Sequence, residues 1–381
     1  MYISDAAKLT QFCERAGRSG VIAVDTEFIR ERTYHPKLCL VQVGFGRGDA
    51  FEGACIDPLL VTDLTPLVSL LGDRTITKVF HACSQDLEVI QDSLGCEVAP
   101  VFDTQLAAAF LGLRQQIGYG ALVEELCGVR LPKAESLTDW SRRPLDDEQL
   151  SYAEDDVRFL PGIYELMMGR LSREERLSWV MPEMEELADP RRYRRDPLDA
   201  FVHLRRASSL TRRQLAVARE VCAWREREAS RRDLPRKWVA SDELLLEASK
   251  RAPRSVERLR RIRGAESLGE RDAAALVASV ARGLACDPQD YPQKTRHERP
   301  SQDMEGVLDL MYATLRIVAD RQGIAPQLVA TKDDLIDFAS GRRDARLATS
   351  GWRHDLVGGP LSRLLAGEMG LTVKDGRVEL L

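Results

Sequence analysis

The chain has 381 residues, which is more than one compact domain usually holds, so roughly two or three domains are expected. Apolar residues make up 44% of it, but no apolar run reaches the length of a membrane span, which argues against a membrane protein. The first twelve residues lack a basic segment followed by an apolar one, so no secretory signal is expected. The eight cysteines are scattered without a CxxC pair, which predicts reduced thiols of a cytoplasmic protein rather than disulfides or zinc ligands.

The net charge of −5 hides an uneven distribution along the chain. Residues 1–190 hold 18 basic and 32 acidic side chains, residues 191–290 hold 24 and 15, and residues 291–381 hold 13 of each. An acidic block followed by a basic one is expected where carboxylates bind cations and arginines meet phosphates. Arginine-rich helical domains that bind no nucleic acid show the same balance, so charge alone leaves both readings open.

The first part of the chain alternates strand and helix patterns. Short apolar, β-branched runs predict strands at Val21–Val24, Leu38–Phe45, Ala50–Ile56 and Thr77–His81. A Gly/Asp turn between the second and third strands indicates a hairpin. Helices are expected near Leu64–Leu71, Ser84–Leu94 and Thr104–Leu111. This order predicts an α/β domain with a mixed sheet over residues 1–171.

The remainder of the chain is predicted to be helical. A connecting helical segment at 172–203 leads to a helical module at 204–285, a proline-punctuated linker at 286–300 and a second module at 301–381. The long helices Thr211–Arg231 and Met304–Gln322 open the two modules, each followed by shorter helices. These shorter helices are expected near Ser241–Lys250, Ser255–Arg261, Glu270–Arg282, Thr331–Ser340 and Leu361–Met369. A small hairpin is expected at Leu371–Leu380 around Asp375-Gly376.

Acidic residues follow two of the predicted strands. Asp25 and Glu27 end the first strand, and residues two apart on a strand point to the same face. Two acids side by side at the end of a buried run repel each other unless a cation or proton lies between them. Asp86 lies in the first turn of the helix that Ser84 is expected to cap, where acids are common. Each feature alone also fits an ordinary acidic turn or helix start.

A third acidic segment lies on a helix predicted to begin with a capping box of Asp146 and Gln149. Pro161 is expected to kink this helix or to start a new one. Tyr152 and Asp156 are four residues apart, so they project together from the border between the apolar and polar faces. They could line a cleft, or they could be an ordinary pair on a helix flank.

Taken in order, these five residues (Asp25, Glu27, Asp86, Tyr152 and Asp156) resemble the three exonuclease motifs of the DEDD superfamily in its tyrosine-bearing branch. The same resemblance covers His81-Ala82, Asp103-Thr104 and the stretch Thr138–Leu145. No histidine occurs at 151–156, where a related branch carries one, which supports the tyrosine assignment.

Within the superfamily the chain is similar to the ribonuclease D family. The phrase Asp25–Phe28, followed by Arg32–Tyr34, Pro36 and Leu38, carries this similarity. It extends over the whole chain, because Leu215–Pro235 and the stretch from Gly351 to Gly367 look like the two C-terminal HRDC modules of that family. The resemblance implies a ribonuclease H-like exonuclease domain followed by two small helical HRDC-like domains.

The implied activity is metal-dependent 3′→5′ hydrolysis of RNA that releases nucleoside 5′-monophosphates, with tRNA precursors as expected substrates and a monomeric enzyme. Such hydrolysis needs a nucleophilic hydroxide and a neutralised leaving oxygen, which two divalent ions about 4 Å apart supply. Hard oxygen ligands suit Mg²⁺ or Mn²⁺. The resemblance implies that Asp25 bridges both ions, Glu27 and Asp156 hold the one with the attacking water, and Asp86 supports the other. Tyr152 would orient that water, because its ordinary pKa near 10 disfavours a full general-base role.

Substrate contacts are less clearly marked in the sequence. Phe28, Leu87 and Trp140 could stack on terminal bases, although each also suits a protein core. His81 is a further substrate-binding position suggested by the motif. Arg212, Arg236 and Lys237 represent basic helix positions that could follow phosphates. Trp224, Trp238 and Trp352 are expected in module cores rather than as stacking platforms.

Two other functions remain open on sequence grounds. The first is a DNA-directed 3′→5′ exonuclease, although no polymerase, helicase or Walker A motif follows the acidic motifs. The second is a non-catalytic nucleic-acid-binding scaffold with a relic site, although all five catalytic positions hold the required residue types.

Overall fold

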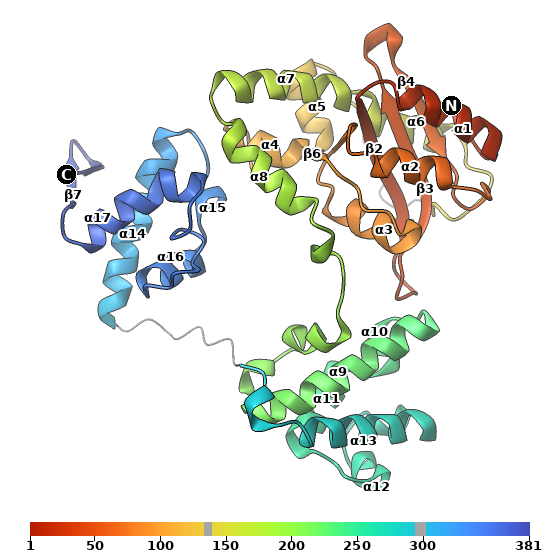
Figure 1. The fold of residues 1–381 in the computed structure, drawn as a ribbon, viewed down its shortest axis with the longest axis vertical. Helices are drawn as coiled ribbons and strands as arrows, with labels where there is room; N and C mark the ends of the chain where they lie inside the picture. Colours follow the sequence, from red (N-terminus) through yellow and green to blue (C-terminus); the bar gives the residue numbers. More distant parts are fainter. Residues whose placement is uncertain (133–138, 294–301) are drawn as a thin grey trace. The chain divides into compact units, whose positions relative to one another are not determined.

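The computed structural model describes residues 1–132, 139–293 and 302–381 (Figure 1). The contacts among these residues divide the chain into two compact units. The first unit holds Met1–Glu27, Leu38–Asp189 and residues 302–381; the second holds Phe28–Lys37 and residues 190–293. Part of the predicted linker and Thr138 of the predicted motif lie outside the described residues. Among the described helices, none combines the length and the apolar character needed to cross a bilayer.

A six-stranded mixed sheet in the order β1-β4-β3-β2-β5-β6 organises the first part of the chain. Its strands are β1 (Tyr2–Ile3), β2 (Val21–Ile29), β3 (Lys37–Phe45), β4 (Glu52–Ile56), β5 (Thr77–Phe80) and β6 (Val101–Asp103). β3 and β4 form the predicted antiparallel hairpin, whereas β2, β5 and β6 run parallel. The predicted mixed sheet is therefore confirmed. The central strand is longer than expected, because it continues to Ile29, so Asp25 and Glu27 lie inside it rather than at its end.

Eight helices accompany this sheet. They are α1 (Ala6–Ala16), α2 (Thr65–Gly72), α3 (Ser84–Leu94), α4 (Thr104–Phe110), α5 (Tyr119–Cys127), α6 (Asp147–Arg158), α7 (Leu160–Arg173) and α8 (Leu177–Leu187). The capping box of Asp146 and Gln149 begins α6, as predicted. Pro161 lies in the first turn of α7, where its missing N–H costs nothing, so the proline restarts the helix after α6. The predicted cap of α3 was wrong: the helix begins at Ser84, but Cys83 occupies the cap position.

The C-terminal residues of the first unit form a small helical module. Its elements are α14 (Gln302–Arg321), α15 (Pro326–Val329), α16 (Lys332–Ala339), the π-helical turn η7 (His354–Gly358), α17 (Gly359–Leu365) and the hairpin β7 (Leu371–Lys374) and β8 (Arg377–Leu380). The hairpin was predicted; the last helix is earlier and shorter than expected. Trp352 stacks on Trp179 of α8 at 5.7 Å, and its indole N–H donates to Glu183 at 3.0 Å. Arg353 also donates two hydrogen bonds to Glu183, so this module shares a core with α8.

The second unit is built around a helix of 21 residues. Its helices are α9 (Arg212–Arg232), α10 (Arg236–Val239), α11 (Asp242–Arg251), α12 (Val256–Arg260) and α13 (Glu270–Leu284). Trp224 of α9 is buried, as Trp352 is in the other module, which agrees with the expected core positions. The same expectation for Trp238 was wrong, because 57% of this residue is exposed. The short helix α10 turns Val239 into the core, and its neighbour Trp238 consequently faces outward.

The segment Phe28–Lys37 belongs by its packing to the second unit. The Tyr34 hydroxyl donates to Glu226 of α9 at 2.9 Å, and the backbone N–H groups of Tyr34 and His35 donate to Asp233 at 3.0 and 2.9 Å. The guanidinium of Arg236 lies 5.0 Å from the centre of the Tyr34 ring. These contacts fix the chain just beyond Glu27 to α9.

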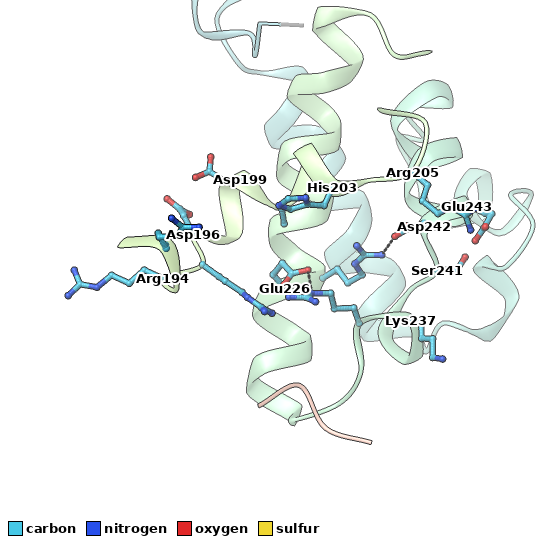
Figure 2. Close-up of a pocket in the computed structure, with 15 residues that line it drawn as sticks. Arg194, Asp196, Asp199, His203, Arg205, Glu226, Lys237, Ser241, Asp242 and Glu243 are labelled. Atoms are coloured by element: carbon cyan, nitrogen blue, oxygen red, sulfur yellow. Dashed lines mark hydrogen bonds and ion pairs between the residues drawn. The ribbon is translucent and has the colours of Figure 1, made fainter. Parts of the chain in front are cut away.

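A charged cavity of about 660 Å³ opens in the second unit (Figure 2). Its charged and imidazole side chains are Arg192, Arg194, Arg195, Asp196, Asp199, His203, Arg205, Arg225, Glu226, Arg236, Lys237, Asp242 and Glu243. Two of its cations are paired within the wall: Arg225 donates to Asp242 at 2.6 Å, and Arg236 donates to both carboxylate oxygens of Glu226 at 2.7 Å. The cavity is therefore polar and mixed in charge, with cations in excess.

Candidate active site

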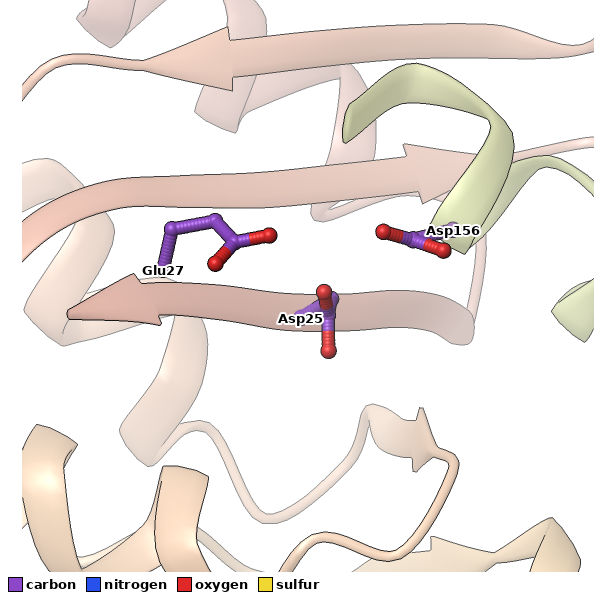
Figure 3. A group of neighbouring side chains, drawn as sticks. All are labelled: Asp25, Glu27 and Asp156. Atoms are coloured by element: carbon purple, nitrogen blue, oxygen red, sulfur yellow. The ribbon is translucent and has the colours of Figure 1, made fainter. Parts of the chain in front are cut away.

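Three carboxylates from two elements meet above the central strand. Each of Asp25, Glu27 and Asp156 offers an oxygen, and these oxygens all lie within 4.8 Å of one another (Figure 3). Asp25 and Glu27 share a face of β2 because strand side chains alternate. Asp156 reaches them from α6, the helix that covers this face (Figure 3). Residues separated by about 130 positions in the chain therefore come within the reach of one metal ion.

A glycine lets α6 approach the sheet closely enough for this arrangement. Gly44 of β3 has no side chain, and a Cβ there would lie 2.8 Å from the ring of Phe51 and 3.3 Å from Val157 of α6. Ala153 and Val157 of α6 are fully buried on the side facing the core. A larger residue at 44 would clash with the Phe51 ring and crowd Val157, and would so disturb the packing of α6 against the sheet. The packing of α6 thus sets the width of the acidic cluster.

Asp86 lies beside the group rather than in it. The carboxylate of Asp86, in the first turn of α3, accepts a hydrogen bond from the hydroxyl of Thr26, the residue between Asp25 and Glu27. The turn before α3 is held by Asp103 at the end of β6, which accepts from the N–H groups of Ala82 and Cys83 at 3.1 and 2.9 Å. The structure therefore brings three of the four predicted acids together and holds the fourth next to them.

Burial raises the pKa of every acid in this cluster, and the charges of nearby acids raise it further. Burial, followed by the charges of Asp86, Asp156 and Glu27, raises the pKa of Asp25 well above its usual value. Burial, followed by the charges of Asp156 and Asp86, raises the pKa of Glu27 to about 8. Burial raises the pKa of Asp156 to about 7 and that of Asp86 to about 6. Acids this strongly destabilised in the charged form hold a proton at neutral pH unless a cation lies between them.

Tyr152 stands one helical turn before Asp156 on α6 and forms a hydrogen bond with that carboxylate. Its side chain is partly exposed, at 36%. Burial and the charges of Asp156 and Glu27 raise the pKa of the phenol above its usual value, so the hydroxyl stays protonated at neutral pH. The ring of Trp140 lies 6.3 Å from that of Tyr152. Tyr152 can therefore donate a hydrogen bond at the edge of the acidic cluster.

A buried ion pair supports the loop that carries Trp140. Arg143 binds both carboxylate oxygens of Asp57, and it also donates to the carbonyls of Trp140 and Cys39 at 2.8 and 2.7 Å. Asp57 is fully buried and accepts a further hydrogen bond from Tyr2. Our sequence reasoning missed Asp57 and Tyr2. An acidic residue directly after the apolar strand β4 was the available signal, but its partner lies 86 positions away.

The predicted substrate-binding residues fall into different environments. Both ring nitrogens of His81 are engaged, with the Thr104 hydroxyl and the Ile117 carbonyl at 2.9 Å each, which favours a structural role. Leu87 and Trp140 are largely buried, and Phe28 belongs to the second unit. Arg236 is paired with Glu226, and Arg212 donates to the Tyr291 carbonyl at 3.0 Å. Their contacts with substrate stay predictions.

The acidic cluster fits divalent cations by the chemistry of its donors. Within the described residues, none of the ion pairs involves Asp25, Glu27, Asp86 or Asp156, so no basic side chain neutralises them there. The donors are carboxylate oxygens without sulfur or imidazole, which is the set that Mg²⁺ and Mn²⁺ prefer. The cluster thus has the composition and the spacing of a divalent-cation site.

Comparison with known proteins agrees with this geometry. A 3′-5′ exonuclease family model matches residues 1–172, and an HRDC domain model matches residues 214–275. The chain is 38% identical to ribonuclease D of Acidiphilium cryptum over 99% of this chain and 96% of that protein. It is 39% identical to ribonuclease D of Sphingobium indicum over 99% and 97%.

The solved structures agree as well. The structure of Escherichia coli RNase D, described as an exoribonuclease involved in structured RNA processing, superposes with a TM-score of 0.83 at 31% identity, covering 96% of this chain and 98% of that one. These similarities span both the sheet-containing part and the helical remainder. The ribonuclease H-like exonuclease fold followed by a helical region is therefore confirmed, and the chain belongs to the ribonuclease D family of 3′→5′ exoribonucleases.

Proposed function

We propose that this chain removes nucleotides one at a time from RNA 3′ ends at the cluster of Asp25, Glu27, Asp86 and Asp156, and releases nucleoside 5′-monophosphates. The observation that carries the proposal is the convergence of Asp25, Glu27 and Asp156, whose oxygens lie within 4.8 Å of one another without a neutralising basic side chain in the described residues. Three partly buried acids without a basic partner are costly to keep for packing alone. It is the arrangement expected of a site that binds cations.

Two Mg²⁺ or Mn²⁺ ions are the proposed cofactors. Asp25 would contact both ions, Glu27 and Asp156 would hold one, and Asp86 would support the other. When bound, such ions lower the pKa of water and neutralise charge on the leaving oxygen. Asp86 is buried and the other three acids are partly buried, so the charges in the site act more strongly than they would in open water.

Tyr152 has the positioning role in this proposal. Its protonated hydroxyl, placed by the hydrogen bond with Asp156, would orient the attacking water rather than remove its proton. Trp140 would limit the motion of Tyr152, because its ring lies near that of the tyrosine and Arg143 donates a hydrogen bond to its carbonyl. The described residues thus supply a rigid support for a hydrogen-bond donor beside the carboxylates.

The proposed substrates are RNAs with a free 3′ end, including tRNA precursors. The family supports RNA over DNA, and the E. coli relative acts in structured RNA processing. The excess of basic residues in 191–290 supports a phosphate-binding role for the second unit. The second HRDC-like module at 301–381, a monomeric state and a cytoplasmic location stay predictions of the sequence.

The test is hydrolysis of a 5′-labelled 12-nucleotide RNA by the full chain with Mg²⁺. A ladder shortening from the 3′ end, release of nucleoside 5′-monophosphates and loss of activity in EDTA are expected. A matched 12-nucleotide DNA should be hydrolysed much more slowly; faster hydrolysis of DNA would favour the DNA-directed alternative. Absence of hydrolysis at any divalent-ion concentration would favour the non-catalytic scaffold.

Neighbouring acids on α6 provide a matched pair of variants. Asp156→Asn should abolish hydrolysis, because it removes a proposed metal ligand. Asp155→Asn changes the adjacent residue in the same way, but Asp155 pairs with Arg158 at 3.3 Å and lies outside the cluster. Asp155→Asn should therefore keep most of the activity. Equal activity in the two variants would contradict the assigned site.

A further inference from the structure

The second unit presents one exposed aromatic ring. Among its described Phe, Tyr and Trp residues, Trp238 is the one classed as exposed, at 57%. Its backbone is fixed, because the Trp238 N–H donates to the Pro235 carbonyl at 2.8 Å and the next two residues, Val239 and Ala240, are buried in the core. The fixed backbone of α10 therefore presents the indole to solvent.

The residues before Trp238 make this surface rigid and positive. Arg236 donates to both oxygens of Glu226 and lies over the Tyr34 ring, so the start of α10 is anchored. Lys237 is exposed and lines the charged cavity (Figure 2). No ion pair of Lys237 is present among residues 1–132, 139–293 and 302–381, so its ammonium group is available to an anion.

We propose that Trp238 and Lys237 form a binding site for single-stranded RNA, in which an unstacked base lies on the indole and the adjoining phosphate meets the ammonium group of Lys237. Trp238 and Lys237 are consecutive residues of α10, so an exposed aromatic face and an exposed cation are available to the base and the phosphate of a bound strand. The cost of ordering such a platform on binding is low, because its backbone is already fixed. The inference deepens the proposed function and rests on it, since it names how RNA is held by the second unit.

A protein partner fits this surface less well. Apart from Trp238, Val202 is the only large apolar residue classed as exposed in the described part of this unit, so no apolar patch surrounds the ring. Protein interfaces concentrate their binding energy in a buried apolar core. A single exposed aromatic residue without apolar neighbours does not provide such a core. The cavity that the adjacent Lys237 lines instead holds more cations than acids, and two of those acids, Glu226 and Asp242, are engaged with arginines.

The first experiment measures binding by the full chain carrying Asp156→Asn, which prevents hydrolysis during the assay. The probes are 12-nucleotide oligoadenylate and oligouridylate RNAs with a 5′ fluorophore. Adding Trp238→Ala should weaken oligoadenylate binding about 5-fold or more, because the base loses its stacking surface. It should also reduce any preference for adenine over uracil, since adenine stacks more strongly. Trp238→Phe keeps an aromatic face and should retain most of the affinity.

Salt dependence separates stacking from charge. Lys237→Gln should reduce the slope of log K against log salt concentration by about one, because one phosphate contact is lost. Trp238→Ala should weaken binding at every salt concentration without changing that slope. Tyr312→Ala serves as the control, since Tyr312 is an aromatic residue of α14 that is 40% exposed and has no proposed contact with RNA. Its affinity should match that of the parent.

Each outcome bears on one of the two claims. Trp238→Ala and Tyr312→Ala with equal affinities would overturn the inference while leaving the exonuclease site untouched. A change in salt slope with Trp238→Ala would also contradict it, because the ring would then act through charge or folding. A native chain that neither binds nor hydrolyses these RNAs would overturn the proposed function itself. Far-ultraviolet circular dichroism of each variant shows whether the fold is kept.

Discussion

The hydroxyl of Thr26 donates a hydrogen bond to the carboxylate of Asp86, so the residue between the two acids of β2 holds the acid of α3 against the strand. Thr26 is buried, and this bond lowers the pKa of Asp86 against the effect of burial. The alternation of the strand explains the arrangement: Asp25 and Glu27 use one face, and Thr26 uses the other. Replacing Thr26 therefore changes Asp86 without touching the other acids.

Thr26→Val removes the hydroxyl at nearly constant volume. We expect a loss of about 10- to 100-fold in divalent-metal affinity or activity, the usual effect of removing an outer hydrogen-bond partner of a ligand. The measurement is the Mn²⁺ concentration needed for half-maximal RNA hydrolysis. Thr26→Ser restores the donor and should recover most of the affinity; a Thr26→Val enzyme with native Mn²⁺ dependence would contradict the role.

The raised pKa values of the cluster predict how the metal-free protein responds to pH. The folded state binds protons more tightly than the unfolded chain at Glu27, with a pKa of about 8, and at Asp156, with a pKa of about 7. The raised pKa values of Glu27 and Asp156 therefore stabilise the folded state fully when the pH lies below the ordinary carboxyl pKa. This stabilisation is lost as the pH rises through about 8. In EDTA, the melting temperature should therefore be lower at pH 8.5 than at pH 5.5. The expected difference is about 2–4 °C for each kcal/mol of unfolding free energy that is lost.

Two controls sharpen this pH experiment. Mg²⁺ should raise the melting temperature at pH 8.5 much more than at pH 5.5, because it binds the ionised acids. Glu27→Gln should flatten the pH dependence, since it removes one of the titrating groups. If the melting temperature in EDTA instead rises between pH 5.5 and 8.5, the pKa values of these acids are not raised in the folded state.

Tyr152→Phe tests the orientation of the attacking water. Loss of the hydroxyl should lower kcat about 10- to 100-fold, the size expected when a reacting group is held less well. KM should change little, because the carboxylates and the RNA contacts remain. The melting temperature should stay close to that of the native chain, since the side chain is partly exposed. A normal kcat would remove Tyr152 from the mechanism.

Arg143→Met tests the support beneath Trp140 and Tyr152. The variant leaves Asp57 buried without its cation, which should cost about 3–5 kcal/mol of stability. Below the melting temperature, kcat should also fall because the Trp140 loop loses an anchor. Arg142→Met is the matched control: Arg142 is exposed and pairs with Asp139 on the surface, so the change should stay within about 0.5 kcal/mol. Thermal melting and single-turnover hydrolysis of both variants provide the comparison.

Local patterns allowed much of the site to be predicted. The period of two placed Asp25 and Glu27 on one face, and the four-residue spacing placed Tyr152 beside Asp156. The capping box at Asp146 located the start of α6, and the turn after β3 located the hairpin. These features depend on neighbours within a few residues, which is why the sequence carries them.

Features that depend on distant partners could not be predicted in this way. The pairing of Arg143 with Asp57 and the packing of Trp352 on Trp179 join segments 86 and more positions apart, with no local pattern to mark them. Trp238 was expected in a core on its apolar character, but the register of the four-residue helix α10 decides which neighbour points inward. The length of β2 was underestimated because Asp25 and Glu27 have low strand propensity, which sheet pairing overrides.

The most direct measurement is anomalous diffraction from crystals of the full chain soaked with Mn²⁺ and a nucleoside 5′-monophosphate. We expect two anomalous peaks about 4 Å apart, both contacting Asp25, with Glu27 and Asp156 on one and Asp86 near the other. The nucleotide phosphate should lie on the same ions. A cluster without manganese, or manganese bound away from Asp25, would contradict the central claim.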